Sequence, residues 1–265
     1  MGRTDLDPAE RDLLTETLRK IMVGASGQVL DLALIEIGWP DLLADLPDLA
    51  IPVVFRLLGE TGVQAPILND VLLAAAGRPP GGTLPLPYTG GSWVVWERTD
   101  RPGAGLDGEL PLRPVPSGDP IPLAAGRRAL GWWLAGTGRA MLELARTHAL
   151  DRTQFGRPVA SFQAVRHRLA ETLVALERAE ATLAAATDPL GSLLAKAAAG
   201  QAALTAARHC QQVLGGIGFT AEHSLHRHVR RALVLDGLLG SHGELVREAG
   251  ALLREERSAP RLVQL

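Results

Sequence analysis

Hydrophobic residues recur at helical spacing over the first 79 positions, in short runs that glycine or proline closes. The first run follows an Asp-Pro helix-start signal at Asp7-Pro8. The apolar positions of the first two runs are Leu13, Leu14, Leu18, Ile21 and Met22, then Val29, Leu32, Leu34 and Ile35. Residues 1–79 are therefore predicted to form an N-terminal domain of short helices.

Residues 80–122 lose this pattern and are rich in proline and glycine. Within them "SWVVWER" predicts a strand, and "GELPLRPV" is a second candidate strand. Such a composition is typical of a linker or a small β element. The segment is too short for a substantial sheet domain, because each strand takes about 5–6 residues plus its turns.

Residues 123–265 return to helical periodicity, with three long runs joined by short turns and a shorter fourth run. One apolar stripe consists of Phe162, Val165, Leu169, Leu173, Leu176 and Leu183. This arrangement predicts an antiparallel four-helix bundle. The expected fold is mainly α, with an N-terminal helical domain, a much reduced β segment and a C-terminal bundle.

Composition restricts the partners and the compartment. Hydrophobic residues make up 46% of the chain, and the net charge of −2 gives no general attraction to nucleic acid or to an anionic membrane. No run reaches the roughly 18 apolar residues of a membrane span, and "MGRTDLDPAERDLL" has no signal-peptide core. The single cysteine, Cys210, excludes an internal disulfide and fits a reducing compartment. We therefore expect a cytoplasmic protein that binds neither nucleic acid nor membrane.

A metal site is not expected. His223, His226 and His228 lie close together in "HSLHRH", but zinc sites usually present pairs of ligands at set spacings. The segment is better interpreted as part of a short helix.

Two glycine-containing turns carry the candidate chemistry. The first is "RTQFGRPVASFQ", which starts at Arg152, and the second is "QQVLGGIGFT", expected at the far end of the bundle. A guanidinium matches the geometry of phosphate oxygens, and a glycine turn lets backbone N–H groups approach an anion. Taken singly, each turn is equally explained as a helix connection capped by arginine or glycine.

In their order, the motifs resemble the C-terminal half of the acyl-CoA dehydrogenase family. The chain shows an Arg-x-x-Phe-Gly turn, a Phe-Gln helix start and a Gln-x-x-Gly-Gly-x-Gly turn, in "RTQFGRPVASFQAVRHRLAE" and "QVLGGIGFTAEHSLHRHVRRALVLDGLLGS". The resemblance covers residues 123–258 well and residues 10–80 faintly. It implies FAD as cofactor, an acyl-CoA as substrate and an electron-transfer flavoprotein as electron acceptor.

The resemblance also implies which residues hold the cofactor. In the family the two turns come from different subunits and bind the adenosine pyrophosphate of FAD. By position, one wall of that site is Arg152, Gln154 and Phe155, and the other is Gln212, Gly215 and Gly216. Ser241, two residues after the family's catalytic position, is assigned to the same site.

The catalytic base of the family is missing. Most members carry a glutamate where this chain has Leu239, and others carry it where this chain has Gly126. Neither side chain can accept the α-proton of a thioester. Asp236 and Glu244 are the nearby carboxylates that could replace the base, although acids near a helix start more often serve as caps.

The family also normally carries a β-barrel-like domain between its helical halves, where this chain has only the short segment 80–122. The missing base and the reduced middle segment fit one hypothesis. The chain resembles a truncated subunit of heteromeric acyl-CoA dehydrogenases of actinobacterial sterol degradation, in which one flavin is bound per unlike dimer. A full-length acyl-CoA dehydrogenase-like partner would then supply the base and the flavin-ring pocket, and the substrate would be a steroid-derived CoA ester. The alternatives are a homo-oligomeric scaffold that has lost FAD, and a self-sufficient enzyme that uses Asp236 or Glu244.

Overall fold

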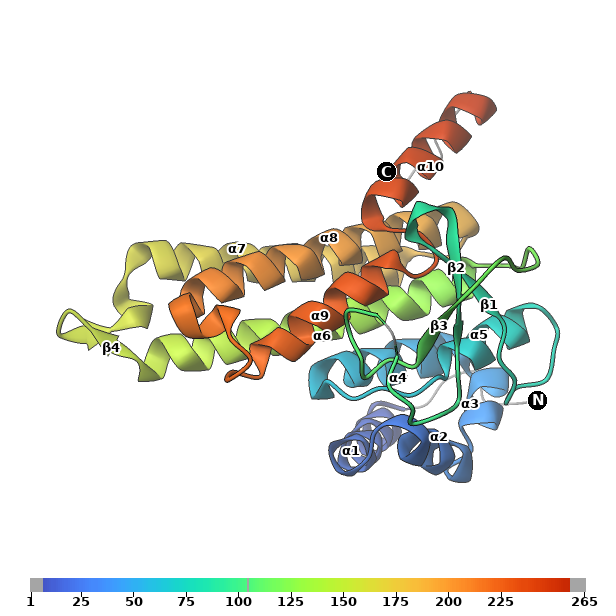
Figure 1. Cartoon of the computed structure of the whole chain (residues 1–265), viewed down its shortest axis with the longest axis horizontal. Helices are drawn as coiled ribbons and strands as arrows, with labels where there is room; N and C mark the ends of the chain where they lie inside the picture. The colour runs from blue at the N-terminus through green and yellow to red at the C-terminus, as the bar shows by residue number, and fades with distance from the viewer. Residues whose placement is uncertain (1–6, 104, 258–265) are drawn as a thin grey trace.

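The computed structural model describes residues 7–103 and 105–257, and the predicted mainly helical fold is confirmed (Figure 1). The outer ends of the first and third predicted segments, residues 1–6 and 258–265, lie outside the described part. The N-terminal helices are α1 Pro8–Gly24, α2 Gly27–Glu36, α3 Trp39–Asp45, α4 Pro47–Thr61 and α5 Leu68–Ala75.

The first helix begins where the Asp-Pro signal predicted. The Asp7 carboxylate accepts the Glu10 N–H at 2.8 Å, and the Glu10 carboxylate accepts the Asp7 N–H at 3.0 Å. This reciprocal capping box satisfies N–H groups that a helix start leaves without partners. Leu18 and Met22 then face the core.

The sequence analysis assigned more helix positions to the buried faces than the structure buries. Several positions assigned to them are exposed by 41–70%: Leu13, Val29, Leu32, Ile35 and Leu173. A helix buries only the face that packs on its neighbours, so residues adjacent in sequence cannot all point inward. The periodicity located the helices correctly but overestimated their buried faces.

The middle segment is a three-stranded antiparallel meander rather than a linker. Its strands are β1 Pro85–Tyr88, β2 Ser92–Trp96 and β3 Leu112–Val115, joined in the order β1-β2-β3, with a 3-10 turn Thr89–Gly91 between the first two. The sequence analysis missed β1, whose two prolines suit an edge strand. Buried Trp96 at the end of β2 stacks on Trp133 with ring centroids 5.5 Å apart, which fixes the sheet to the helical core.

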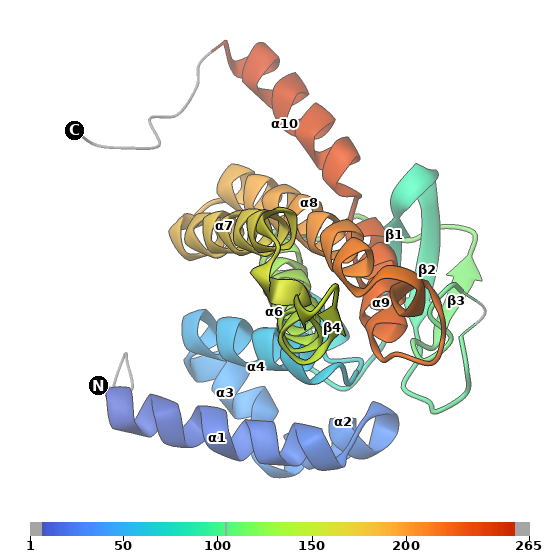
Figure 2. The same ribbon diagram turned by 90° about the vertical axis from the view of Figure 1, so that its left-hand side faces the viewer.

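The bundle consists of α6 Ala124–Asp151, α7 Gln163–Ala185 and α8 Pro189–Leu214, with α9 Leu225–Gly237 along α6 and α8. The last helix, α10 His242–Glu256, was expected as the fourth bundle helix, but it projects away from the body (Figures 1 and 2). Leu245 and Ala249 attach it to α8 through Leu193 and Ala197.

Close helix crossings require glycine at two points of α6. A Cβ on Gly136 would lie 2.1 Å from the Arg56 carbonyl oxygen of α4, and one on Gly138 would lie 2.4 Å from a Leu176 methyl of α7. The backbones of α4 and α6 therefore approach more closely than any larger residue at position 136 would permit.

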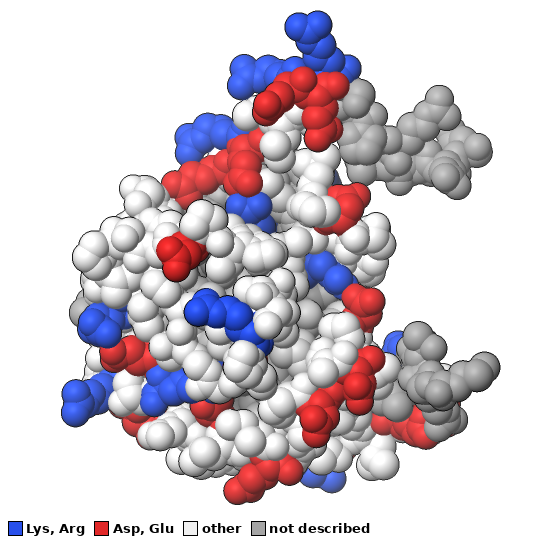
Figure 3. Space-filling model, turned by 90° about the vertical axis from the view of Figure 1, so that its right-hand side faces the viewer, with Lys and Arg blue, Asp and Glu red and all other residues white. Residues whose placement is uncertain are grey.

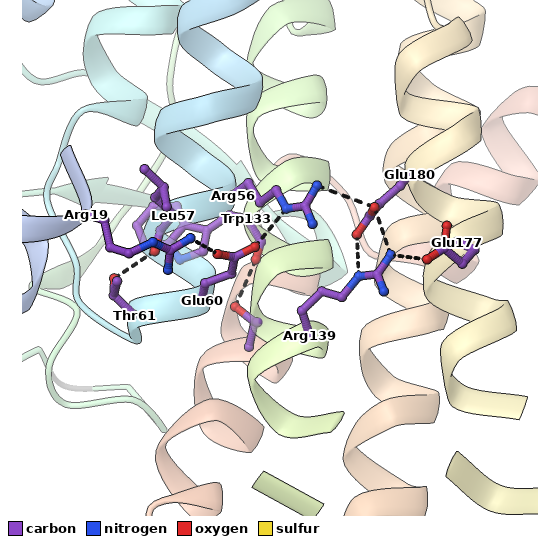
Figure 4. Close-up of polar contacts among 10 residues, drawn as sticks. Arg19, Arg56, Leu57, Glu60, Thr61, Trp133, Arg139, Glu177 and Glu180 are labelled. Atoms are coloured by element: carbon purple, nitrogen blue, oxygen red, sulfur yellow. Dashed lines mark hydrogen bonds and ion pairs between the residues drawn. The ribbon is translucent and has the colours of Figure 1, made fainter. Parts of the chain in front are cut away.

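An alternating ladder of charges joins the N-terminal helices to the bundle (Figure 4). Glu60 of α4 accepts from Arg19 of α1 at 2.7 Å and from Arg56 at 2.8 Å. Arg139 of α6 donates to Glu180 of α7 at 2.7 Å, and Arg56 lies 3.6 Å from the same carboxylate.

Charged residues of both signs gather on α10, while the middle of the face beneath it is mostly uncharged (Figure 3).

Candidate functional site

The first glycine turn is a small hairpin at the end of the bundle. Strands β4 Thr153–Gln154 and β5 Arg157–Pro158 pair around Phe155 and Gly156, before a 3-10 turn Val159–Ser161. Both central residues have positive φ, 54° and 76°, as a two-residue hairpin loop of the I′ type requires. This conformation is unfavourable for phenylalanine, yet the ring of Phe155 is 91% exposed. A strained, exposed aromatic residue indicates a contact surface.

The arginines of this hairpin have different environments. The Arg157 guanidinium lies 4.3 Å from the centre of the Phe162 ring, a cation–π contact that holds the hairpin against the start of α7. Arg152 borders an open cavity of about 570 Å³ together with His148 and His223. Burial, His223 and Arg152 lower the pKa of His148.

The second glycine turn lies at the same end of the bundle, not at the far end as predicted (Figure 1). The His148 and His223 rings, one on α6 and one just after this turn, are 6.4 Å apart. The reason is topological: α6 and α8 run in the same direction, because α7 returns the chain between them. One chain therefore presents both turns on one surface.

The geometry of the second turn is open. Gly215 ends α8 with a φ of 65° and begins the 3-10 turn Gly215–Phe219. A Cβ built on Gly215 or on Gly216 would meet no atom within 4 Å, and the Phe219 side chain is 67% exposed. Gln212, in the last turn of α8, is also exposed. The turn is thus accessible to a ligand or to another chain.

The two positions at which the resemblance implies a glutamate, Gly126 and Leu239, lie next to each other in the structure. A Cβ on Gly126 would lie 2.9 Å from the Leu239 Cδ1 and 2.6 Å from a Leu72 methyl. Leu239 is 1% exposed and Leu72 fully buried. Hydrocarbon therefore fills the point on which both alternative glutamate positions converge.

Asp236 lies beside this apolar contact, but other groups occupy its oxygens. One oxygen accepts the His242 backbone N–H at 3.1 Å, and the other lies 2.9 Å from the His242 Nδ1. The first oxygen would lie 2.1 Å from a Cβ on Gly200, so α8 presses directly on it. Asp236 is 6% exposed and fixes the junction between α9 and α10.

Glu244 serves as a helix cap. Its carboxylate accepts the Ser241 N–H at 2.9 Å, the Ser241 hydroxyl at 2.8 Å and the Gly90 N–H at 2.8 Å. These hydrogen bonds lower its pKa to about 2. A carboxylate with so low a pKa is a weak proton acceptor at neutral pH. Both side-chain and backbone donors of Ser241 are thereby engaged within the chain.

Sequence reasoning overlooked Lys196, a fully buried lysine of α8. Its ammonium donates to the Asp236 carbonyl oxygen at 2.7 Å and to the Gly240 carbonyl oxygen. Burial lowers its pKa to about 7, partly opposed by Asp236. A lone lysine inside an alanine-rich helix was the available signal. Lys196 holds the backbone on both sides of Leu239.

Two further features are the possible metal ligands and the thiol of Cys210. Over residues 7–103 and 105–257, no three histidine, cysteine or acidic side chains are grouped so as to hold a metal ion. Cys210 is fully buried, and burial raises its pKa to about 12.

No helix in the described part is long and apolar enough to span a membrane.

Residues 122–248 match the sequence model of the acyl-CoA dehydrogenase C-terminal domain. Acyl-CoA dehydrogenase FadE34 of Mycobacterium tuberculosis is 37% identical over 219 residues, which are 72% of this chain and 31% of that protein. The chain thus spans about a third of the length of the curated relatives it matches.

Solved structures share the fold over nearly the whole chain. The Tcur3481–Tcur3483 steroid ACAD superimposes with a TM-score of 0.73 at 19% identity and covers 95% of this chain and 99% of its own. The ChsE4–ChsE5 complex from Mycobacterium tuberculosis gives 0.66 at 18% identity, over 98% and 100%. These structures show a common fold. The matched C-terminal domain and the 37% identity to FadE34 show that the chain belongs to the acyl-CoA dehydrogenase family.

Proposed function

We propose that the chain is a subunit of a heteromeric, FAD-dependent acyl-CoA dehydrogenase. It contributes part of the adenosine-pyrophosphate site of FAD and no catalytic base. A full-length partner of the same family supplies the base and the flavin-ring pocket. The complex oxidises the α,β bond of an acyl-CoA thioester and passes the electrons to an electron-transfer flavoprotein.

The observation that carries this proposal is the contact among Gly126, Leu239 and Leu72. Proton abstraction needs a basic group within hydrogen-bonding reach of the α-carbon. Here both places where the family keeps a glutamate are filled with hydrocarbon, and Asp236 and Glu244 are engaged elsewhere. A partner subunit is the remaining source of the base.

The end of the bundle fits the nucleotide portion of FAD. Exposed Phe155 offers a face for stacking, Arg152 offers a fork donor to phosphate oxygens, and Gly215 and Gly216 leave room for close backbone approach. Gln212 supplies an amide at the same end. Bound FAD supplies the hydride acceptor of the reaction. Ser241 does not contribute to this surface, because Glu244 occupies its donors.

The partner and the substrate class are proposed from the solved relatives. ChsE4–ChsE5 is a complex of two proteins, and Tcur3481–Tcur3483 is a steroid ACAD. By analogy, the substrate proposed for this complex is a steroid-derived CoA ester.

Co-expression with an acyl-CoA dehydrogenase-like chain that retains its glutamate tests the proposal. We expect a stable heteromer with flavin absorbance and turnover of an acyl-CoA, while the chain alone is colourless and inactive. A colourless, inactive complex would favour the homo-oligomeric scaffold. Turnover by the chain alone, lost in Asp236→Asn or Glu244→Gln, would establish the self-sufficient enzyme.

A further inference from the structure

An open groove between α7 and α8 carries arginines that no motif had singled out. The groove has a volume of about 650 Å³, and Arg168, Arg208, His209 and Gln212 contribute its polar lining. Helices α7 and α8 lie side by side in both ribbon views (Figures 1 and 2). Only Gln212 belongs to the family's cofactor motif.

A neutral histidine holds the Arg168 guanidinium in place. Arg168 Nη1 lies 3.1 Å from His209 Nε2, and a guanidinium can only donate, so Nε2 must accept. The ring proton is then on Nδ1, which lies 2.9 Å from the Thr172 hydroxyl oxygen. That hydroxyl donates to the Arg168 carbonyl oxygen at 2.8 Å, which closes the chain of hydrogen bonds.

Burial and the nearby arginines favour the neutral form of His209. Burial, Arg168 and Arg208 lower the pKa of His209, while Glu171 acts in the opposite direction. The imidazole therefore orients Arg168 without cancelling its charge at neutral pH.

The two groove arginines differ from the arginines that build the fold. Arg139 binds Glu177 and Glu180, and Arg231 binds Asp107. Among the described residues, in contrast, neither Arg168 nor Arg208 lies within salt-bridge distance of a carboxylate. The closest polar contact of Arg208 is the Thr205 hydroxyl at 3.3 Å. A guanidinium that is already oriented and still carries net charge is suited to binding a phosphate.

We propose that this groove is a phosphate subsite, in which Arg168 and Arg208 bind a phosphate group of a nucleotide and His209 positions Arg168. The identity of the nucleotide rests on the proposed function. Two sources share this chemistry: the adenosine pyrophosphate of FAD and the 3′-phosphate of a CoA thioester.

Titration calorimetry on the full chain tests the subsite with two probes. ADP represents the FAD portion, and adenosine 3′,5′-bisphosphate represents the CoA portion. We expect the preferred probe to lose at least about tenfold in affinity in Arg168→Gln, since hydrogen bonds to charged groups are the strong ones. The matched control is Arg166→Gln, an exposed arginine on the same helix outside the groove lining, which should bind normally.

A second variant separates binding from structure. His209→Asp would still hold the guanidinium, but it would place a carboxylate against the charge of Arg168. We expect it to weaken probe binding as much as Arg168→Gln does, with an unchanged or higher unfolding temperature. A merely structural role for Arg168 predicts undiminished binding in this variant, and that result would overturn the subsite.

The outcomes also separate the subsite from the proposed function. Absence of binding for both probes at millimolar concentration overturns the subsite, as does equal affinity in Arg168→Gln and Arg166→Gln. A co-expressed complex that lacks flavin, together with Arg168-dependent probe binding, rejects the flavoprotein proposal and supports the subsite. A complex whose flavin content and acyl-CoA affinity are both unaffected by Arg168→Gln rejects the subsite alone.

Discussion

The free end of the bundle and the junction of α9 and α10 differ in how their polar groups are used. At the free end, Phe155 and Phe219 are largely exposed, and a Cβ on Gly215 or Gly216 would meet no atom within 4 Å. At the junction, Leu239 is sealed, and Glu244, Asp236 and Lys196 are all bound to partners within the chain. The difference shows that the polar and aromatic groups at the free end are open to a ligand, whereas the region around Leu239 is part of the core.

The largest change in stability is expected from placing a glutamate at the buried position 239. Leu239→Glu would bury a carboxylate against Gly126 and Leu72, and should lower the free energy of unfolding by about 3–5 kcal/mol. Urea denaturation measures this, with Leu239→Met, which preserves volume, as the control at under about 1.5 kcal/mol. Normal stability together with dehydrogenase activity in the isolated Leu239→Glu chain would contradict the sealed-site interpretation.

At the open end, substitutions should change binding and spare stability. Arg152→Gln and Phe155→Ala are expected to reduce the flavin content of the co-expressed complex by about tenfold or more. Each substitution removes an exposed side chain that is proposed to contact the nucleotide portion of FAD. The unfolding temperature should stay unchanged. Arg146→Gln, on the same helix and paired with Glu143, serves as the control. Flavin retained in full by both variants would remove this end from the cofactor site.

The charge ladder should show an intermediate effect that depends on burial. Glu180 is 12% exposed and contacts both Arg56 and Arg139, so Glu180→Gln should cost about 1–2 kcal/mol of unfolding free energy. Glu177 pairs with Arg139 at the solvent-exposed end of the ladder, and Glu177→Gln should change little. Thermal or urea unfolding compares the two, and equal losses would show that burial does not decide the contribution.

The last effect appears only on acidification and concerns His228 at the open cavity. Burial, Arg231 and Arg227 lower the pKa of His228 to about 4, opposed by Glu109. Because the folded-state pKa lies below the ordinary value of about 6.5, the unfolded chain takes up the proton first. The stabilisation is complete above about pH 6.5 and is lost as the pH falls toward 4.

Urea unfolding at several pH values across this window measures the loss, and His228→Gln should reduce the dependence on pH. An identical pH profile in the variant would assign the dependence to other groups. His228 packs against Gly62, where a Cβ would lie 2.9 Å from the ring, so a larger residue at position 62 would disturb the same contact.

The periodicity of apolar residues and the order of the motifs predicted much of the helical fold and the family. The helix at Pro8–Gly24 was predicted from its start signal and apolar spacing, and the ordered turns identified the family. The strand β1 was missed because its prolines are atypical of strands. The apolar residues Leu13 and Val29 were placed in the core, although only the tertiary contacts of a helix decide which face is covered.

By itself, the sequence determined that the chain is mainly helical, that it carries the family's turns and that positions 126 and 239 hold glycine and leucine rather than an acid. The tertiary structure alone decided that both turns lie at one end, that Gly126 and Leu239 pack together, and that His209 lies beside Arg168. The physical reason is range. Periodicity and capping act over a few neighbouring residues, whereas these contacts join segments that only the packing of helices brings together.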